Sequence, residues 1–402
     1  MQDVPRWQQA LFERRNLGVK LDLAAVRAVH AALGSPAAEI PGLHVLGTNG
    51  KGSTAAMAAH ALQRRGRRVG LYTSPHLHRV GERVRIDGVA RTDEEMQVLC
   101  DRVLAAEGAG PRPLTFFEVL TLAALLAFET GGVDAMVLEA GLGGRLDATR
   151  LGPMSRIAAT LFTPIALDHM AYLGPTVAAI AGEKAAVMAD GAPAFSAPQE
   201  PAAAEVLRAT ATGCGVSLTF VEPLGWAPLA GVHQRINAGL ALAGARVLAP
   251  EVEEADLEGT VWPGRLERRA VGGGTVVFDV AHNPHGIATL VAALRESPVR
   301  ERVVLFGCLA DKDGPGMLAT LAALDCPLWL AAPAGGHVLH APGGRDARVF
   351  AGLEDPGLAA ACSELLARGG ELVVCGSHHT VGHLRGHLLA VAADAWALSD
   401  PR

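Results

Sequence analysis

The sequence GTNGKGST, residues 47–54, constrains the fold more than any other part of the chain. It follows a short apolar run, Leu43 to Leu46, and precedes a stretch with the composition of a helix. Glycines at 47, 50 and 52 allow backbone angles closed to other residues, so that consecutive amides can point at an anion. The start of the following helix adds partial positive charge. This order of strand, glycine-rich turn and helix predicts a phosphate-binding loop.

Two residue types in this loop suit a nucleotide. Lys51 can place a point charge on the β and γ phosphates, and Ser53 and Thr54 offer hydroxyls where a P-loop presents one to magnesium. The spacing differs from the common GxxxxGKS/T pattern, because position 45 is Val and Gly52 separates Lys51 from Ser53. The alternative interpretation is a glycine turn that only links a strand to a helix.

Length and composition indicate a soluble protein of two domains. A chain of 402 residues exceeds one ordinary core, and a hydrophobic content of 50% supplies apolar side chains for two. Apolar runs fall short of the ~20 residues that cross a bilayer, and the first residues mix charge into any signal core, so we expect a cytoplasmic location. The six cysteines show no metal or disulfide spacing, and a net charge of -6 argues against a surface that coats nucleic acid.

Apolar β-branched runs alternate with alanine- and leucine-rich helical stretches from Leu43 onward, as is typical of parallel sheets covered by helices. The predicted class is α/β, with a mainly parallel P-loop ATPase-type domain at residues 1–266 and a smaller Rossmann-like domain at residues 267–402. The boundary falls in WPGRLERR, where a Pro-Gly turn interrupts the alternation. Strands are expected near 43–46, 69–73, 134–139, 157–162, 193–196, 275–279, 302–307, 327–331 and 371–375, and helices near 53–65, 93–107, 116–130 and 175–188.

Polar residues follow several of these strands. Glu139 ends an apolar run at the edge where open α/β sheets hold ligands, which is a usual place for a nucleotide's magnesium. The next segment, GLGGRLDAT at 141–149, superficially matches a dinucleotide fingerprint, but Leu146 stands where the third glycine belongs. Arg145 and Asp147 either position a ligand or form a local salt bridge in a tight turn.

Three further segments are individually weak candidates. Asp168 and His169 follow the next strand, and Glu183 and Lys184 lie on a helix downstream. Most such pairs are structural or solvated, and magnesium prefers oxygen to a histidine nitrogen. The segment YTSPH at 72–76 offers a hydroxyl at the same sheet edge or is a simple turn.

The segment TFFE at 115–118 stands out because aromatic residues make up only 4% of the chain. Two adjacent rings beside a carboxylate suit a flat heteroaromatic ligand, but a helix N-cap followed by core phenylalanines explains the pattern equally well. In the second domain, DVAHNP at 279–284 and DKD at 311–313 each follow a strand and are expected to line one cleft. The histidine-rich GSHHTVGH at 376–383 lacks metal spacing and is interpreted as a surface turn.

A series of motifs occurs in a characteristic order along the chain: GTNGKGST, YTSPHL, TFFE, LEAGLGGRLDAT, LDH, GEKA, WPGR, DVAHNP and DKD. This order is similar to that in folylpolyglutamate synthase and dihydrofolate synthase. The chain resembles that family, within the Mur ligase superfamily, from about Leu17 to its last strand. In the family, ATP phosphorylates a folate-type carboxylate, and the amino group of L-glutamate displaces phosphate from the acyl phosphate. The resemblance implies this ligase activity on folates, and activity on dihydropteroate as well.

The resemblance also implies cofactors, partners and residue roles. ATP is the implied co-substrate and Mg2+ the implied cofactor, K+ is left open, Lys184 would carry a carbamate formed from CO2, and the expected state is a monomer. His282 and Asn283 belong to a second-domain motif of unspecified role. The implied residues are Lys51, Lys184 and His169 for catalysis; Ser74, Glu139 and His169 for the metal; Asn49, Gly50, Lys51, Gly52, Ser53, Thr54, Asn237, Arg265 and Asp279 for ATP; and Thr115, Phe116, Phe117, Glu118, Leu146, Asp147 and Ala148 for the pterin-bearing substrate.

Departures from the family pattern leave the substrate range open. The lysine block reads EKAAV where the family usually has EKAGI, and Pro164 stands where a small or polar residue is common. Neither change removes an implied ligand. The segment NLGVKLDLAAV aligns with the region that holds dihydropteroate in bifunctional bacterial members, but its similarity does not decide which activities exist.

Two other functions compete with the folate ligase. A cell-wall Mur enzyme would share fold and chemistry, but it would normally carry a further N-terminal domain for its UDP sugar. A P-loop that begins at residue 47 leaves room for a helix or two and nothing larger. A nucleotide-switched binding protein would use the P-loop without forming bonds. It would have no reason to keep Glu139, His169 and Lys184.

Overall fold

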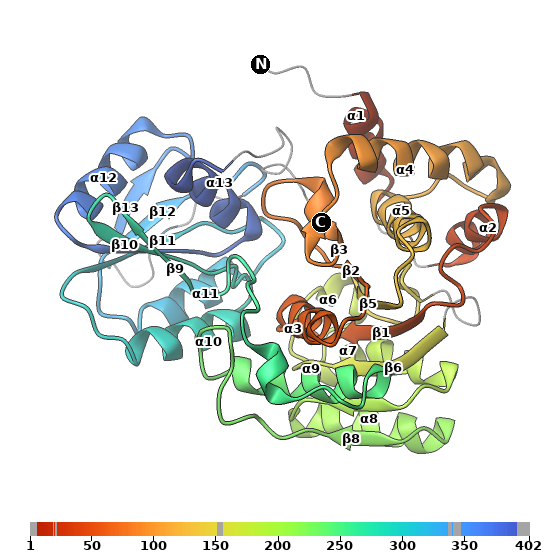
Figure 1. Cartoon of the computed structure of the whole chain (residues 1–402). Helices are drawn as coiled ribbons and strands as arrows, with labels where there is room; N and C mark the ends of the chain where they lie inside the picture. The colour runs from red at the N-terminus through yellow and green to blue at the C-terminus, as the bar shows by residue number, and fades with distance from the viewer. Residues whose placement is uncertain are drawn as a thin grey trace. The chain divides into compact units, whose positions relative to one another are not determined.

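The structure is a computed structural model that describes residues 6–18, 20, 22–150, 156–336, 340 and 347–391. Each of its two compact units has a sheet of its own (Figure 1). In the described residues no helix is long and apolar enough to cross a membrane. The domain boundary expected between residues 266 and 267 stays a prediction. The first unit comprises Met1–Pro75, Val80–Pro228 and Gln234–Val261, and the second comprises His76–Arg79, Leu229–His233 and Trp262–Arg402.

An eight-stranded sheet forms the core of the first unit. Its order is β4 (Val89–Ala90), β3 (Val84–Ile86), β2 (Val69–Tyr72), β5 (Ala135–Glu139), β1 (Pro41–Leu46), β6 (Arg156–Phe162), β7 (Ala194–Ser196) and β8 (Leu218–Phe220). Strands β3 and β4 pair antiparallel at one edge, and the six others are parallel. The α/β class and the five strands predicted here are confirmed. The three strands that were not predicted are two or three residues long, too short for a periodic signal.

Helices cover this sheet because its central strands are apolar on both faces. Strand β1 is buried from Gly42 to Leu46. Helix α5 is buried continuously from Val119 to Phe128, so it lies inside the unit. The expected helix at 175–188 is α7 followed by a 3-10 turn, Ala186–Asp190. The helices are α1 (Arg6–Glu13), α2 (Ala24–Ala32), α3 (Lys51–Arg64), α4 (Asp93–Ala106), α5 (Phe116–Thr130), α6 (Met170–Leu173), α7 (Val177–Ala185), α8 (Pro201–Cys214) and α9 (Gln234–Leu248).

The second unit has a six-stranded sheet between two helical layers. Its order is β13 (Ala347–Phe350), β12 (Leu328–Ala331), β11 (Arg302–Phe306), β14 (Glu371–Cys375), β10 (Gly274–Phe278) and β9 (Glu267–Val271), with only β9 antiparallel. Alternate residues of β10 enter different cores: Phe278 packs with Leu365, and Val277 packs with Leu290. Two apolar cores on opposite faces confirm the predicted Rossmann-like architecture. The helices are α10 (Pro284–Arg295), α11 (Gly314–Leu321), α12 (Pro356–Ala367) and α13 (His378–Leu389).

The interpretation of residues 376–383 as a surface turn is wrong. Only Gly376 is a turn residue, with φ at 108°. Ser377 caps α13 by accepting a hydrogen bond from the Thr380 amide at 3.0 Å, and the Thr380 hydroxyl donates to the carbonyl of Gly307 at 2.7 Å. Both side chains are buried. The serine is a helix N-cap, and the histidines that follow it belong to a helix.

Candidate active site

The glycine-rich turn between β1 and α3 is fixed by neighbours from distant parts of the first unit. The amides of Thr48 and Asn49 both donate to the carbonyl of Pro164, at 2.9 and 3.3 Å. Gly47 has φ at 138°, and a Cβ there would collide with the hydroxyl of Thr163. Gly50 has φ at 92°, and a Cβ there would lie 2.5 Å from Asn237 Oδ1. Both positions therefore require glycine.

Helix α3 begins without a side-chain cap. Gly50 is its N-cap residue, has a left-handed backbone, and has no side chain that could accept from the first amides of the helix. Lys51 Nζ donates to the Thr48 carbonyl at 3.1 Å, which holds the ammonium group over the same turn. A glycine N-cap, the positive end of the helix dipole and a lysine are the features with which a helix N-terminus can bind an anion.

A chain of buried side chains links the P-loop to α9. Gln234 Nε2 donates to Ser53 Oγ at 3.3 Å, and Asn237 Nδ2 donates to Gln234 Oε1 at 2.9 Å. Thr54 Oγ1 is buried and has no hydrogen-bond partner within the described part of the chain. The structure thus places Asn237, a predicted ATP contact, beside the turn. The sequence alone does not point to Gln234, whose only signal is its spacing of one helical turn from Asn237.

Ser74 and Glu139 meet at the carboxyl ends of neighbouring strands β2 and β5. The Ser74 amide donates to Glu139 Oε2 at 3.1 Å, and both residues are buried. Ser74 Oγ has no hydrogen-bond partner among the described residues. A buried hydroxyl without a partner next to a carboxylate fits a hard cation, because Mg2+ prefers oxygen ligands.

His169 and Lys184 lie after β6 and on α7. His169 has a left-handed backbone, φ 50°, and its Nε2 is 3.9 Å from Asp168 Oδ1. Burial lowers the pKa of Lys184 to about 7, with a further lowering by the charge of Lys51 and opposition from Asp168 and Asp147. A large part of the Lys184 amine is therefore uncharged near neutral pH. Among the described residues, no group of three or more His, Cys, Asp or Glu side chains could hold a metal ion.

Asp147 organises the loop that contains Leu146 and Ala148. Its Oδ2 accepts from the Leu142 amide at 2.7 Å, and its Oδ1 accepts from the amide and hydroxyl of Thr149 at 2.9 and 2.5 Å. His44 Nε2 lies 2.8 Å from the same hydroxyl. Because that hydroxyl proton goes to the carboxylate, His44 must donate through Nε2–H.

Arg145, in the same loop, forms an ion pair with Glu183 of α7 at 3.1 Å. The Arg145 amide also donates to the Glu183 carbonyl at 2.8 Å. The salt bridge therefore joins the loop to the helix that carries Lys184.

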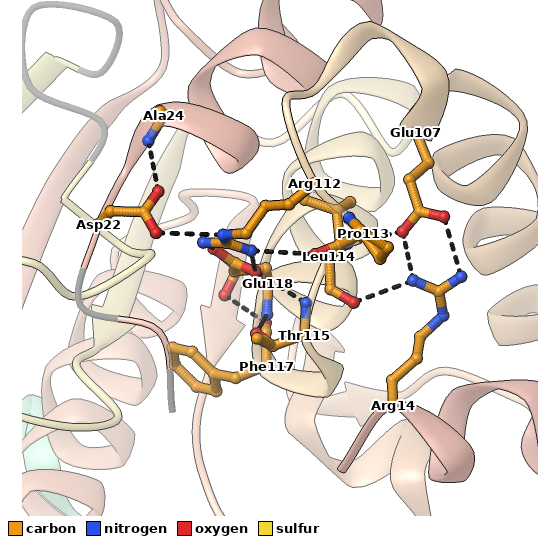
Figure 2. Close-up of polar contacts among 11 residues, drawn as sticks. Arg14, Asp22, Ala24, Glu107, Arg112, Pro113, Leu114, Thr115, Phe117 and Glu118 are labelled. Atoms are coloured by element: carbon orange, nitrogen blue, oxygen red, sulfur yellow. Dashed lines mark hydrogen bonds and ion pairs between the residues drawn. The ribbon is translucent and has the colours of Figure 1, made fainter. Parts of the chain in front are cut away.

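The TFFE segment forms the start of α5 (Figure 2). Thr115 Oγ1 accepts from the Glu118 amide at 3.3 Å, and Glu118 Oε2 accepts from the Thr115 amide at 2.7 Å, which is a capping box. Phe116 is buried and stacks on Phe12, with ring centroids 5.7 Å apart. Phe117 is only partly buried and packs at 5.8 Å from the Tyr72 ring. The N-cap interpretation is confirmed, and Phe117 is the ring of the pair that is left partly exposed.

In the second unit, the predicted polar residues hold backbone turns. Asp279 accepts from the amides of Leu266 and Ala281, both at 2.9 Å, and therefore fixes the turn that carries Arg265. His282 Nδ1 lies 2.9 Å from its own turn's Val280 carbonyl. Two others are helix N-caps: Asn283 caps α10 and Asp313 caps α11. Asp311 and Lys312 form an ion pair with each other at 3.7 Å. The expected common cleft stays a prediction.

Two domain models of one superfamily match the chain. The Mur ligase middle domain matches residues 45–194, and the Mur ligase, glutamate ligase domain matches residues 264–378. The dihydrofolate synthase/folylpolyglutamate synthase of Escherichia coli is 34% identical over 94% of this chain and 94% of its own length. A probable bifunctional folylpolyglutamate synthase/dihydropteroate synthase of Haloferax volcanii is 36% identical over 77% of this chain, which spans 41% of that longer protein.

A solved structure has the same fold over almost the whole chain. Escherichia coli FolC, in complex with DHPP and ADP, superposes with a TM-score of 0.82 and 30% identity, covering 96% of this chain and 98% of its own. The fold and the paired domain models define a Mur ligase-type enzyme. The chain belongs to the folylpolyglutamate synthase/dihydrofolate synthase family and is an ATP-dependent glutamate ligase of that type, active on folates. The resemblance deduced from the motifs is confirmed.

Proposed function

We propose that the enzyme adds L-glutamate to both dihydropteroate and reduced folates through an acyl phosphate. In the first step a carboxylate oxygen of the pterin substrate attacks the γ-phosphorus of ATP, and ADP leaves. In the second step the glutamate nitrogen attacks the acyl carbon, phosphate leaves with the C–O bond electrons, and the nitrogen loses a proton. The N-terminus of α3, with Gly50 as its N-cap residue and the Lys51 ammonium group held at the Thr48 carbonyl, supports this proposal most directly.

The chemistry needs charge neutralisation and alignment more than a strong nucleophile. Two anions must approach each other, so fixed amides and ammonium groups lower the barrier by stabilising charge on the transferred phosphoryl group. Asn49, Gly50, Lys51, Gly52, Ser53 and Thr54 supply these groups in the first unit. Asn237 lies beside Gly50 and holds its side chain through Gln234, which suits a contact to the nucleotide. Arg265 and Asp279 are proposed ATP contacts of the second unit.

We assign Ser74 and Glu139 as the residues that hold Mg2+, with His169 as a third ligand. The partnerless Ser74 hydroxyl and the buried Glu139 carboxylate fit the ion, and a histidine nitrogen fits it less well. When bound, Mg2+ neutralises charge on the phosphates.

We propose that Lys184 is carbamylated. Its uncharged amine attacks the carbon of CO2 and releases one proton, which gives a carbamate. The lowered pKa of Lys184 favours this step, because burial disfavours the ammonium form. Incubation with 13C-bicarbonate should give a carbamate resonance in the NMR spectrum that is absent from Lys184→Arg. An identical resonance in that variant would refute the assignment.

The substrate assignment is tested by ADP release with magnesium, ATP and L-glutamate. Dihydropteroate, a reduced folate and a muramyl-peptide precursor serve in turn as the third substrate. We expect turnover with both pterin compounds and none with the muramyl compound. Turnover with reduced folate alone would restrict the enzyme to polyglutamylation, and turnover with dihydropteroate alone would restrict it to dihydrofolate synthesis. No ADP release with either pterin compound would refute the proposal.

A further inference from the structure

Arg112 connects two segments that are far apart in the sequence (Figure 2). Its Nε donates to Asp22 Oδ2 at 3.1 Å, just before α2. Its Nη1 and Nη2 donate to the two oxygens of Glu118 at 2.9 and 2.8 Å, at the start of α5. One planar guanidinium group therefore holds two carboxylates, and the Arg112 side chain is only 20% exposed.

Both ends of this connection are anchored to backbone. Asp22 Oδ1 accepts from the Ala24 amide at 3.1 Å, which fixes the first turn of α2. Glu118 Oε2 accepts from the Thr115 amide and so completes the α5 cap. Arg112 Nη1 also donates to the adjacent Pro113 carbonyl at 3.0 Å. The Asp22-Arg112-Glu118 latch thus sets the position of one helix start relative to another.

The latch changes what Glu118 can do. Both of its oxygens already accept from Arg112, and its side chain is 6% exposed. A carboxylate held in this way acts on a ligand by positioning its neighbours. The neighbour that can respond is Phe117, which projects from the same helix start.

Phe117 has little freedom to compensate for a shift of α5. Its ring packs against Tyr72, and a Cβ at Gly141 would lie 2.6 Å from Phe117 Cζ, so the loop backbone passes directly over the ring. A small displacement of the helix start would move this ring within a confined space. Rings that stack on flat heteroaromatic ligands are sensitive to such displacements.

We propose that Arg112 is a positioning residue for the pterin ring: it fixes the α5 start, and hence Phe117, against the segment before α2. The inference rests on the proposed function, in which the substrate carries a pterin ring, and on the substrate-binding role that the family resemblance implies for Phe117. Arg112 itself touches neither the reacting carboxylate nor ATP in this scheme.

The test is steady-state kinetics of Arg112→Met. We expect KM for dihydropteroate or reduced folate to rise about tenfold, with KM for ATP and kcat within about twofold of wild type, because orientation of the ring alone is lost. Arg112→Lys should give an intermediate KM, since an ammonium group cannot span both carboxylates. An unchanged KM for the pterin substrate in Arg112→Met would overturn the proposal.

Arg14→Met is the matched control. Arg14 donates to Glu107 and, at 2.9 Å, to the Leu114 carbonyl, so it anchors the same loop without touching Asp22 or Glu118. We expect it to lower the unfolding temperature and leave the pterin KM unchanged. An equal rise in KM in both variants would reduce Arg112 to a general stabiliser. A wild-type enzyme silent with every pterin would instead refute the proposed function.

Discussion

The N-termini of helices α3 and α5, both in the first unit, differ in how they are capped. Helix α3 begins at Gly50, in a left-handed conformation and without a side-chain cap. The N-cap residue of helix α5, Thr115, forms a complete capping box with Glu118, and Arg112 donates hydrogen bonds to the Glu118 carboxylate. Both follow loops rich in turn-forming residues, and both carry residues predicted to bind substrates.

The difference shows how one fold separates binding from rigidity. A helix N-terminus without an N-cap side chain can direct its backbone amides at a bound anion such as a phosphate. A capped start satisfies its own amides and has fewer to offer a ligand. We therefore expect the α3 start to bind through its backbone and the α5 start to bind through a side chain, Phe117, held in place.

The largest expected effect on activity is at the N-terminus of α3, which has no N-cap side chain. Lys51→Met removes the ammonium group at the N-terminus of α3, so ADP release should fall by about 10²- to 10³-fold, the usual loss for one group that stabilises transferred charge. The measurement is kcat at saturating ATP and folate. A near-normal kcat would show that the backbone amides suffice and that the lysine is dispensable.

Strand β1, which leads into the turn before α3, contains a buried histidine, His44, whose protonation makes the stability of the first unit depend on pH. Burial lowers the pKa of His44 to about 4 from 6.5, against the opposing charges of Asp147 and Asp190. The unfolded chain binds the proton first, so the stability from His44 is complete above pH 6.5 and is lost as pH falls through about 4. Between about pH 7.5 and about pH 5 the unfolding free energy should drop by about 2 kcal/mol from this group.

The comparison variant for this titration is His44→Gln, which keeps an N–H donor for Thr149 and cannot be protonated in this range. Urea unfolding of both proteins at the two pH values isolates the contribution of His44. Identical pH dependence in the two proteins would mean that His44 does not titrate as its burial requires.

A smaller effect is expected from Gly50→Ala. The residue must keep φ at 92°, which costs roughly 1–2 kcal/mol for a residue with a Cβ, and the added atom would push on Asn237. We expect KM for ATP to rise and the Asn237 to Gln234 hydrogen bond to be disturbed. Gly66→Ala, with φ at 76° and no atom within 4 Å of the new Cβ, is the control for backbone strain alone. Equal effects of the two variants on KM would argue against a role for the Asn237 contact.

The sequence predicts most of the sheets because their central strands are continuous apolar runs, which carry a strong signal. It does not predict β9, whose residues Glu267 to Val271 are mostly exposed and charged. The edge strand depends on pairing with β10, and pairing leaves no mark on local composition. Helix α9 is likewise absent from the prediction, although it carries Asn237 and Gln234.

The candidate site also has a part that the local sequence predicts and a part that depends on contacts between distant residues. The P-loop is evident from sequence because glycine, lysine and hydroxyl residues are adjacent there. The link from Gln234 to Ser53 spans 181 residues, and the link from Arg112 to Asp22 spans 90, so neither can be deduced from spacing. Even the Glu118 cap is only one of two alternatives in the sequence, because the same four residues suit a ligand and a helix N-terminus.

The smallest expected effect is at the N-terminus of α5, which has the capping box. Thr115→Ala removes the side-chain acceptor of the α5 cap while the Glu118 pair with Arg112 remains, so the unfolding free energy should fall by about 1 kcal/mol. Chemical denaturation measures this loss, and kcat for ADP release should stay near wild type because Thr115 acts on the position of α5 and not on the phosphates. The two variants should thus have opposite properties. Lys51→Met should have a low kcat and the stability of the wild type, and Thr115→Ala should have a normal kcat and a lower stability. A Thr115→Ala enzyme with normal stability and a kcat reduced as far as that of Lys51→Met would show that the capped start also serves the reaction directly, and the division between the two helix starts would fail.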